Sequence, residues 1–190
     1  MAQAPMNKDS LLRLLPAAKE DTAKVLLLIN LTKANKNSDI TAAYKYVEEA
    51  LKLSRAIGYK KGIFLALNNE ISLTRIEGKN SLALEKSKSL VSLAEKSNDS
   101  FNIATGYLIL GEVYDSNGDN EKAMANCFKG TGVAERLNDQ GLMQDAYSAL
   151  QRIYFSRSEF DKAILYGQKA IGIAQSMGDK SRVMTQSYNL

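Results

Sequence analysis

The sequence of 190 residues contains few side chains that could carry out catalytic chemistry. It has no histidine, which excludes Ser-His-Asp and Cys-His catalysis, histidine general bases and histidine-ligated metals. Its single cysteine, Cys127, rules out an internal disulfide and any Cys-x-x-Cys site. Without a histidine to activate its thiol, Cys127 is expected to be a buried packing residue. We therefore predict no catalytic residue and no enzyme activity within this chain.

One segment is similar to the start of a calcium-binding loop. Asp115, Asn117 and Asp119 have the alternating spacing of the first three ligands of such a loop. The glycine required at the sixth position is replaced by Asn120, and the glutamate required at the twelfth by Asn126. The segment also coincides with a turn of the repeat described below, and the glycines form no phosphate-binding loop. The sequence therefore predicts no metal site and no cofactor.

The charge pattern bears on possible partners. The chain carries 25 Lys and Arg and 21 Asp and Glu, a formal net charge of +4. Lysine and glutamate alternate, as in Glu85-Lys86 and Glu121-Lys122, rather than forming the basic stripe of a nucleic-acid binder. The longest apolar run, residues 25–29, is far shorter than the roughly 20 residues of a membrane span. We expect neither nucleic-acid binding nor membrane contact by this segment.

The elements that must position any site come from an internal repeat. Small residues recur every 40 positions, at Ala43, Ala83, Ala123 and Ala163. A second column with the same step holds only glycine or asparagine, at Gly58, Asn98, Asn138 and Gly178. These two residue types tolerate the left-handed conformation that ends a helix. Aspartates that can begin the next helix follow the last three of them, whereas Tyr59 follows Gly58.

This pattern predicts an all-α fold, an α-α superhelix of antiparallel helical hairpins with a period of 40 residues. Apolar residues recur at helical spacing between the breaks, which indicates two helices of roughly 17 residues in each unit. Residues 1–20 form an N-terminal segment with a short helix, and four units follow at about 21–60, 61–100, 101–140 and 141–180. Residues 181–190 are interpreted as the truncated first helix of a fifth unit, so the chain is expected to be a piece of a longer protein.

These residues resemble the tetratricopeptide repeat family. The third unit matches best, with Leu110-Gly111, Tyr114, Gly118-Asp119 and Ala123 at the family's spacing. The second and fourth units depart from it, with Ile71 and Gln151 where the family prefers glycine. The resemblance implies a solenoid that binds proteins or peptides on an inner surface lined by the first helix of each hairpin.

Applying the family's groove positions to this sequence selects residues in the second, third and fourth units. They are Leu65, Asn68, Asn69, Ser72, Arg75, Thr105, Leu108, Glu112, Asp115, Asp145, Ser148, Arg152 and Phe155. The family's dicarboxylate clamp is not expected, because only Asn69 agrees with its pattern. The mixture of Arg75 and Arg152 with Glu112 and Asp115 favours a polar or zwitterionic peptide.

The start of the chain, including Leu15-Pro16 and Gly58-Tyr59, resembles the extracytoplasmic repeat regions of bacterial sensor histidine kinases. In that reading, Ala2-Gln3-Ala4 is the remnant of a signal-peptidase site. The implied function is the sensor or interaction region of a membrane-anchored signal-transduction protein. Two alternatives stay open: a scaffold that self-associates, for instance as a homodimer, and a cytoplasmic peptide-pheromone receptor of the Rap type.

Overall fold

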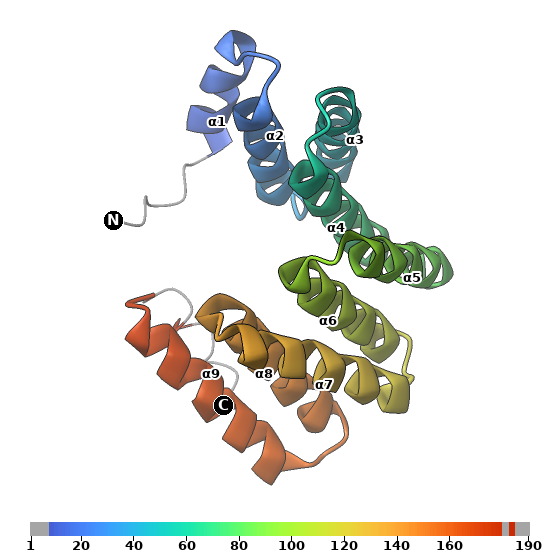
Figure 1. The fold of residues 1–190 in the computed structure, drawn as a ribbon, viewed down its shortest axis with the longest axis vertical. Helices are drawn as coiled ribbons and strands as arrows, with labels where there is room; N and C mark the ends of the chain where they lie inside the picture. Colours follow the sequence, from blue (N-terminus) through green and yellow to red (C-terminus); the bar gives the residue numbers. More distant parts are fainter. Residues whose placement is uncertain (1–7, 180–182, 185–190) are drawn as a thin grey trace. The chain divides into compact units, whose positions relative to one another are not determined.

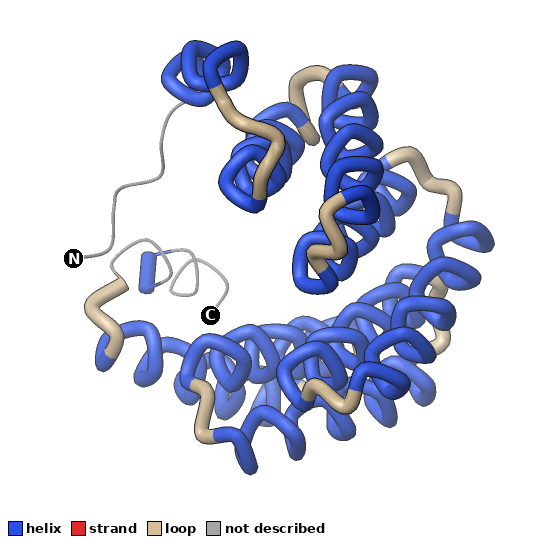
Figure 2. The backbone as a smooth tube through the Cα atoms, turned by 45° about the horizontal axis from the view of Figure 1, so that its top comes forward, coloured by secondary structure: helices blue, strands red, loops and turns tan. Residues whose placement is uncertain are grey.

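The computed structural model describes residues 8–179 and 183–184 of the chain. A short helix α1 (Lys8–Leu14) and a 3-10 turn η1 (Leu15–Ala17) precede α2 (Thr22–Asn35) and α3 (Ile40–Ala56). The chain continues through α4 (Lys60–Ile76), α5 (Asn80–Ser97), α6 (Ser100–Ser116), α7 (Asn120–Leu137), α8 (Gln140–Ser156) and α9 (Phe160–Ser176) (Figure 1). Short loops join these helices, and residues 8–179 contain no strand (Figure 2). The predicted all-α fold of helical hairpins is confirmed.

Left-handed residues end the second helix of each hairpin, as the sequence predicts. The φ angle is +67° at Gly58, +53° at Asn98, +51° at Asn138 and +68° at Gly178. Asp99 and Asp139, which follow two of these residues, cap the next helix, as where Asp139 Oδ1 accepts a hydrogen bond from the Leu142 amide at 2.9 Å. Tyr59 is the exception, because α4 begins without a side-chain cap.

Within the second, third and fourth hairpins, a left-handed residue also occupies the turn between the two helices. Gly78 and Gly118 have φ angles of +71° and +77°. Ser158 stands at the same repeat position with a φ of +60°, although it carries a Cβ. A non-glycine residue is disfavoured in this region, so the sequence of the last turn leaves some backbone strain in place.

The chain divides into two compact units, whose boundary lies inside α5. The N-terminal unit comprises residues 1–86, and the C-terminal unit comprises residues 87–190. The core of the N-terminal unit lies among α2, α3 and α4 and consists of Val25, Leu28, Ile29, Ala43, Val47, Ala50, Leu53, Ala66 and Leu73.

The main core of the C-terminal unit is built from α7, α8 and α9. It consists of Ala123, Cys127, Tyr147, Ala149, Leu150, Ile153, Tyr154, Ala163 and Ala170. Ala123 is fully buried where α7 approaches α6, and a Cβ at Gly111 would lie only 3.0 Å from the carbonyl oxygen of Ala123. Small residues on both helices therefore permit a close crossing, which is the role that the repeat pattern predicts for the alanine column.

Tyrosine side chains connect successive helices of the C-terminal unit at equivalent repeat positions. Tyr107 of α6 donates a hydrogen bond to Glu95 of α5 at 2.6 Å, and the Lys129 ammonium lies 5.2 Å from the centre of its ring. Tyr147 of α8 repeats both contacts, with Glu135 of α7 at 2.8 Å and Lys169 of α9 at 5.3 Å. Each tyrosine thus bridges the helix before it and the helix after it through a hydrogen bond and a cation–π contact.

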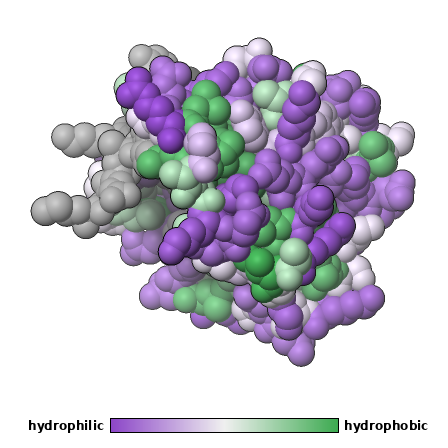
Figure 3. All heavy atoms as spheres, turned by 90° about the horizontal axis from the view of Figure 1, so that it is seen from above, coloured by the Kyte–Doolittle hydropathy of each residue, from purple (hydrophilic) through white to green (hydrophobic). Residues whose placement is uncertain are grey.

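Hydrophilic side chains cover much of the face drawn in Figure 3, with smaller hydrophobic patches between them. Among the residues that the structure describes, no helix combines the length and the apolar character needed to cross a membrane.

Candidate functional site

The thirteen predicted site residues all lie on the first helices of the hairpins. Leu65, Asn68, Asn69, Ser72 and Arg75 belong to α4 in the N-terminal unit. The others belong to α6 and α8 in the C-terminal unit, where Thr105, Leu108, Glu112 and Asp115 lie on α6 and Asp145, Ser148, Arg152 and Phe155 on α8. In the C-terminal unit, the predicted site residues therefore lie on two helices, α6 and α8, that pack against each other.

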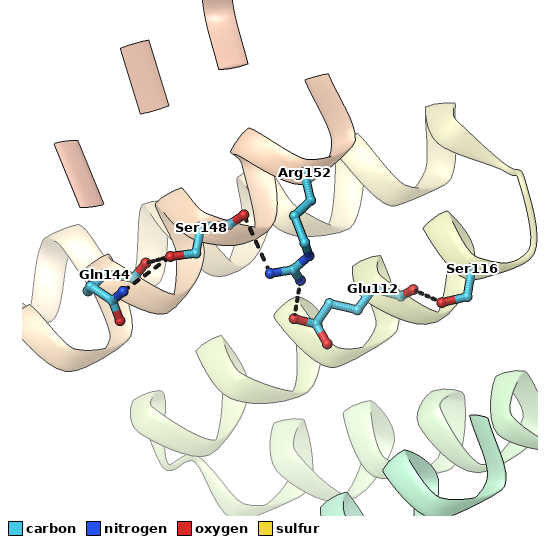
Figure 4. A network of polar contacts seen from close by, with 5 residues as sticks. All are labelled: Glu112, Ser116, Gln144, Ser148 and Arg152. Atoms are coloured by element: carbon cyan, nitrogen blue, oxygen red, sulfur yellow. Dashed lines mark hydrogen bonds and ion pairs between the residues drawn. The ribbon is translucent and has the colours of Figure 1, made fainter. Parts of the chain in front are cut away.

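An ion pair joins the two helices of this set. Arg152 Nη2 lies 2.6 Å from Glu112 Oε1, and the two residues are separated by 40 positions in the sequence (Figure 4). Their side chains are 48% and 32% exposed, so the pair is open to solvent and to a ligand. Because only one guanidinium nitrogen contacts the carboxylate, the fork of Arg152 keeps further N–H groups for a second acceptor.

Smaller polar groups extend this contact along both helices. Arg152 Nη1 lies 3.5 Å from the carbonyl oxygen of Ser148, and Gln144 Nε2 donates to Ser148 Oγ at 3.2 Å (Figure 4). On α6, Ser116 donates to the carbonyl oxygen of Glu112 at 2.9 Å. Gln144 and Ser116 were not among the predicted residues, since the family's groove positions skip them.

The C-terminal ends of α6 and α8 also meet. Ser156 Oγ lies 3.4 Å from Asp115 Oδ1, and the neighbouring Phe155 side chain is 61% exposed. Phe155 packs edge-on against Phe160 of α9, with 5.6 Å between the ring centres. Phe160 also lines a surface depression of about 330 Å³ that runs over residues 158–162. A carboxylate and an exposed aromatic pair therefore stand near each other at this end of the C-terminal unit.

Two of the predicted residues are buried and contribute to packing. Leu108 is 6% exposed, and its side chain lies under Gly130 of α7, where a Cβ would come within 2.8 Å of it. Asn69 is 9% exposed and donates a hydrogen bond from Nδ2 to the carbonyl oxygen of Leu65 at 2.7 Å. Sequence position alone could not show this, because burial depends on how closely the neighbouring helix approaches.

The cysteine lies where the sequence predicts, in the core. Cys127 is fully buried, and burial raises the pKa of its thiol to about 12. A thiol with that pKa supplies almost no thiolate at neutral pH, so Cys127 is a poor nucleophile.

The segment similar to a calcium loop serves as a turn. Asp119 Oδ1 accepts a hydrogen bond from the Lys122 amide at 3.1 Å, and its Oδ2 lies 2.6 Å from Lys122 Nζ. These contacts to the Lys122 side chain and backbone lower the pKa of the Asp119 carboxyl. Among residues 8–179, no group of three or more His, Cys, Asp or Glu side chains is placed to hold a metal ion.

Comparisons with known proteins identify the fold. No family model matches the sequence, and no curated protein matches it. A STAND signal-transduction ATPase with a tetratricopeptide repeat sensor from Pyrococcus horikoshii is 17% identical, with a TM-score of 0.65 over 94% of this chain and 28% of that protein. A Rap protein complexed with competence and sporulation factor is 17% identical, with a TM-score of 0.79 over 94% of this chain and 51% of that one.

The similarity to a third structure extends over most of that protein's length. The kinesin light chain TPR-like repeats of Podospora anserina are 13% identical, with a TM-score of 0.59 over 90% of this chain and 86% of that one. These likenesses show a tetratricopeptide-repeat-like fold. The chain spans only 28% of the STAND protein and 51% of the Rap protein.

Proposed function

We propose that this chain is a non-enzymatic module that binds a protein or peptide through the face formed by α6 and α8. The observation that carries the proposal is the exposed ion pair between Glu112 and Arg152, which joins the two helices at equivalent repeat positions. A surface ion pair of this exposure contributes little to the free energy of unfolding, about 0–1 kcal/mol. Stabilisation of the fold is therefore a weak explanation for the presence of this pair.

The chemistry of this face suits a peptide backbone with polar side chains. A carboxylate of the ligand can take the free N–H groups of Arg152, while Glu112 and Asp115 accept hydrogen bonds from its amides or cations. Phe155 offers an exposed aromatic surface three residues further along α8. A zwitterionic or mixed-charge segment therefore fits better than a strongly acidic one. In the N-terminal unit, the predicted residues of α4 are also part of the proposal, as residues that contact a peptide or protein.

The wider role that we propose is the sensor or interaction region of a bacterial signal-transduction protein such as a histidine kinase, on the extracytoplasmic side of the membrane. The resemblance of the start of the chain supports it. The tetratricopeptide repeat sensor of the STAND protein has a similar fold.

A cytoplasmic peptide-pheromone-type regulator is the second candidate. The observation that favours it is the likeness, with a TM-score of 0.79, to a Rap protein complexed with competence and sporulation factor. Both roles predict a peptide or protein on the same face and differ in where the chain resides.

Selection from a phage-displayed library of random 12-residue peptides tests the shared prediction. Selected peptides are then measured by fluorescence anisotropy against Arg152→Ala and against Arg136→Ala, an exposed arginine of α7 in the same unit. We expect Arg152→Ala to weaken binding at least tenfold and Arg136→Ala to change it less than twofold.

Two results count against the proposal: no enriched peptide, or equal losses in both variants. Sedimentation of the free protein over a hundredfold concentration range completes the experiment. Concentration-dependent dimers without peptide binding would favour the scaffold role instead.

A further inference from the structure

The turn between α3 and α4 differs in charge from the equivalent turns of the other repeats. Lys52 and Arg55 lie near the end of α3, and Lys60 and Lys61 begin α4. We name these four residues the basic turn. No acidic residue occurs in the sequence between Glu49 and Glu70. The basic turn thus places four positive charges within ten residues of chain.

In the second and third repeats, an acidic residue of this turn has a structural role. Arg55 is replaced by Glu95 and Glu135, which accept hydrogen bonds from Tyr107 and Tyr147. The residue in the tyrosine column of the second unit is Leu67, so no hydroxyl is present to hold a glutamate at position 55. Arginine thus replaces glutamate at position 55 in the same repeat in which leucine replaces tyrosine at position 67. The Arg55 side chain is exposed.

The aspartate cap is also replaced. Tyr59 stands in the column of Asp99, Asp139 and Asp179, and α4 begins without a side-chain cap. The Tyr59 ring instead packs over Gly62, where a Cβ would lie 2.4 Å from Tyr59 Cδ1. Packing of the ring therefore replaces the capping contact, and the negative charge of the aspartate is lost from the turn.

The four cations are available to a partner. All four residues are exposed, and none of their side chains has an ion-pair or hydrogen-bond partner in the described part of the chain. Lys52 and Arg55 share one face of α3 because they are three residues apart. The Tyr59 amide donates to the Ser54 carbonyl oxygen at 2.8 Å, which closes the turn and brings the ends of α3 and α4 together.

We propose that the basic turn docks a compact acidic segment of a partner protein. A compact segment fits this surface because the four cations lie within ten residues of chain, and Glu48, exposed one helical turn before Lys52, places a negative charge at that border. Ile57, 39% exposed, is the one large hydrophobic residue exposed at the tip of this turn, which is little apolar surface for insertion into a lipid interface. This inference is independent of the α6–α8 face.

Binding of fluorescein-labelled octaglutamate to the full chain tests the proposal. The variant is Lys60→Gln/Lys61→Gln, and the matched control is Lys33→Gln/Lys36→Gln, which removes two exposed lysines beside the α2–α3 turn of the same unit. In 50 mM salt we expect the first variant to weaken binding at least fivefold and the control to change it less than twofold. Raising the salt to 300 mM should weaken wild-type binding at least tenfold, since the charges are exposed.

Three outcomes would overturn the proposal. The first is no binding of octaglutamate in 50 mM salt, and the second is an equal loss in both variants. The third is preferential binding of phosphatidylserine vesicles or of a 20-base-pair DNA duplex with the same dependence on Lys60 and Lys61, which would assign the surface to a membrane or a nucleic acid. Circular dichroism of each variant confirms that the helices are intact.

Discussion

Gly111→Ala tests the close crossing of α6 and α7. The added Cβ would lie 2.4 Å from Cys127 Sγ and 3.0 Å from the Ala123 carbonyl oxygen. The cysteine side chain can rotate, but the backbone oxygen cannot move without shifting α7. Overpacking of this kind costs about 1–3 kcal/mol. The contacts with backbone atoms place the cost in the upper part of that range, about 2–3 kcal/mol. Alanine in place of glycine inside a helix returns about 0.5–1 kcal/mol, so the expected net destabilisation is about 1–2.5 kcal/mol.

Urea unfolding followed by far-ultraviolet circular dichroism measures this difference. Gly172→Ala on α9 is the matched control, because a Cβ there meets no atom within 4 Å. It should stabilise the protein by about 0.5–1 kcal/mol through helix propensity alone. In the double variant Gly111→Ala/Cys127→Ala, the methyl group takes the space of the sulfur. The loss of unfolding free energy in this double variant should be smaller than the sum of the losses in Gly111→Ala and Cys127→Ala, by about 0.5 kcal/mol or more.

Two results would refute this reasoning. One is a Gly111→Ala protein as stable as the parent while Gly172→Ala is stabilised, which would show that α6 and α7 have room for the methyl group. The other is strict additivity in the double variant, which would show that the cysteine sulfur is not what the methyl group meets.

Three further predictions follow from local geometry. Ser158→Gly should raise the melting temperature, since it relieves a left-handed φ of +60° worth about 1 kcal/mol; a lower melting temperature would contradict this. Cys127, with a pKa of about 12, should resist iodoacetamide at pH 8 until urea unfolds the chain; labelling of the native protein would show an accessible thiolate. Hydrogen bonds from Tyr44 and Lys79 lower the pKa of Glu77, so its contribution to stability is complete above the unfolded pKa and is lost as pH falls through the native pKa. Tyr44→Phe should therefore reduce the loss of thermal stability between about pH 5 and pH 3, and an unchanged profile would contradict the pairing.

Repeat columns in the sequence carry most of the information on the fold. The column of Gly58 and Asn138 predicts left-handed helix ends because few residue types adopt that conformation without strain. The alanine column predicts close crossings for a similar steric reason, and Ala123 is buried accordingly. The left-handed conformation of Ser158 was not predictable from its residue type, because the surrounding hairpin imposes that backbone conformation on a serine.

The candidate site is less visible in the sequence. The columns place Glu112 and Arg152 at equivalent positions, but their pairing depends on side-chain rotamers and on the spacing of α6 and α8. The burial of Leu108 depends on the approach of Gly130 from another helix. The contacts of Tyr107 and Tyr147 with lysines likewise require the positions of three helices at once.

These tyrosine contacts have a consequence for the dynamics of α7. Through Lys129 this helix contacts Tyr107 before it, and through Glu135 it contacts Tyr147 after it. Local opening of α7 must therefore break side-chain contacts on two sides. Amide hydrogens of α7 should therefore exchange with solvent only when much of the C-terminal unit opens.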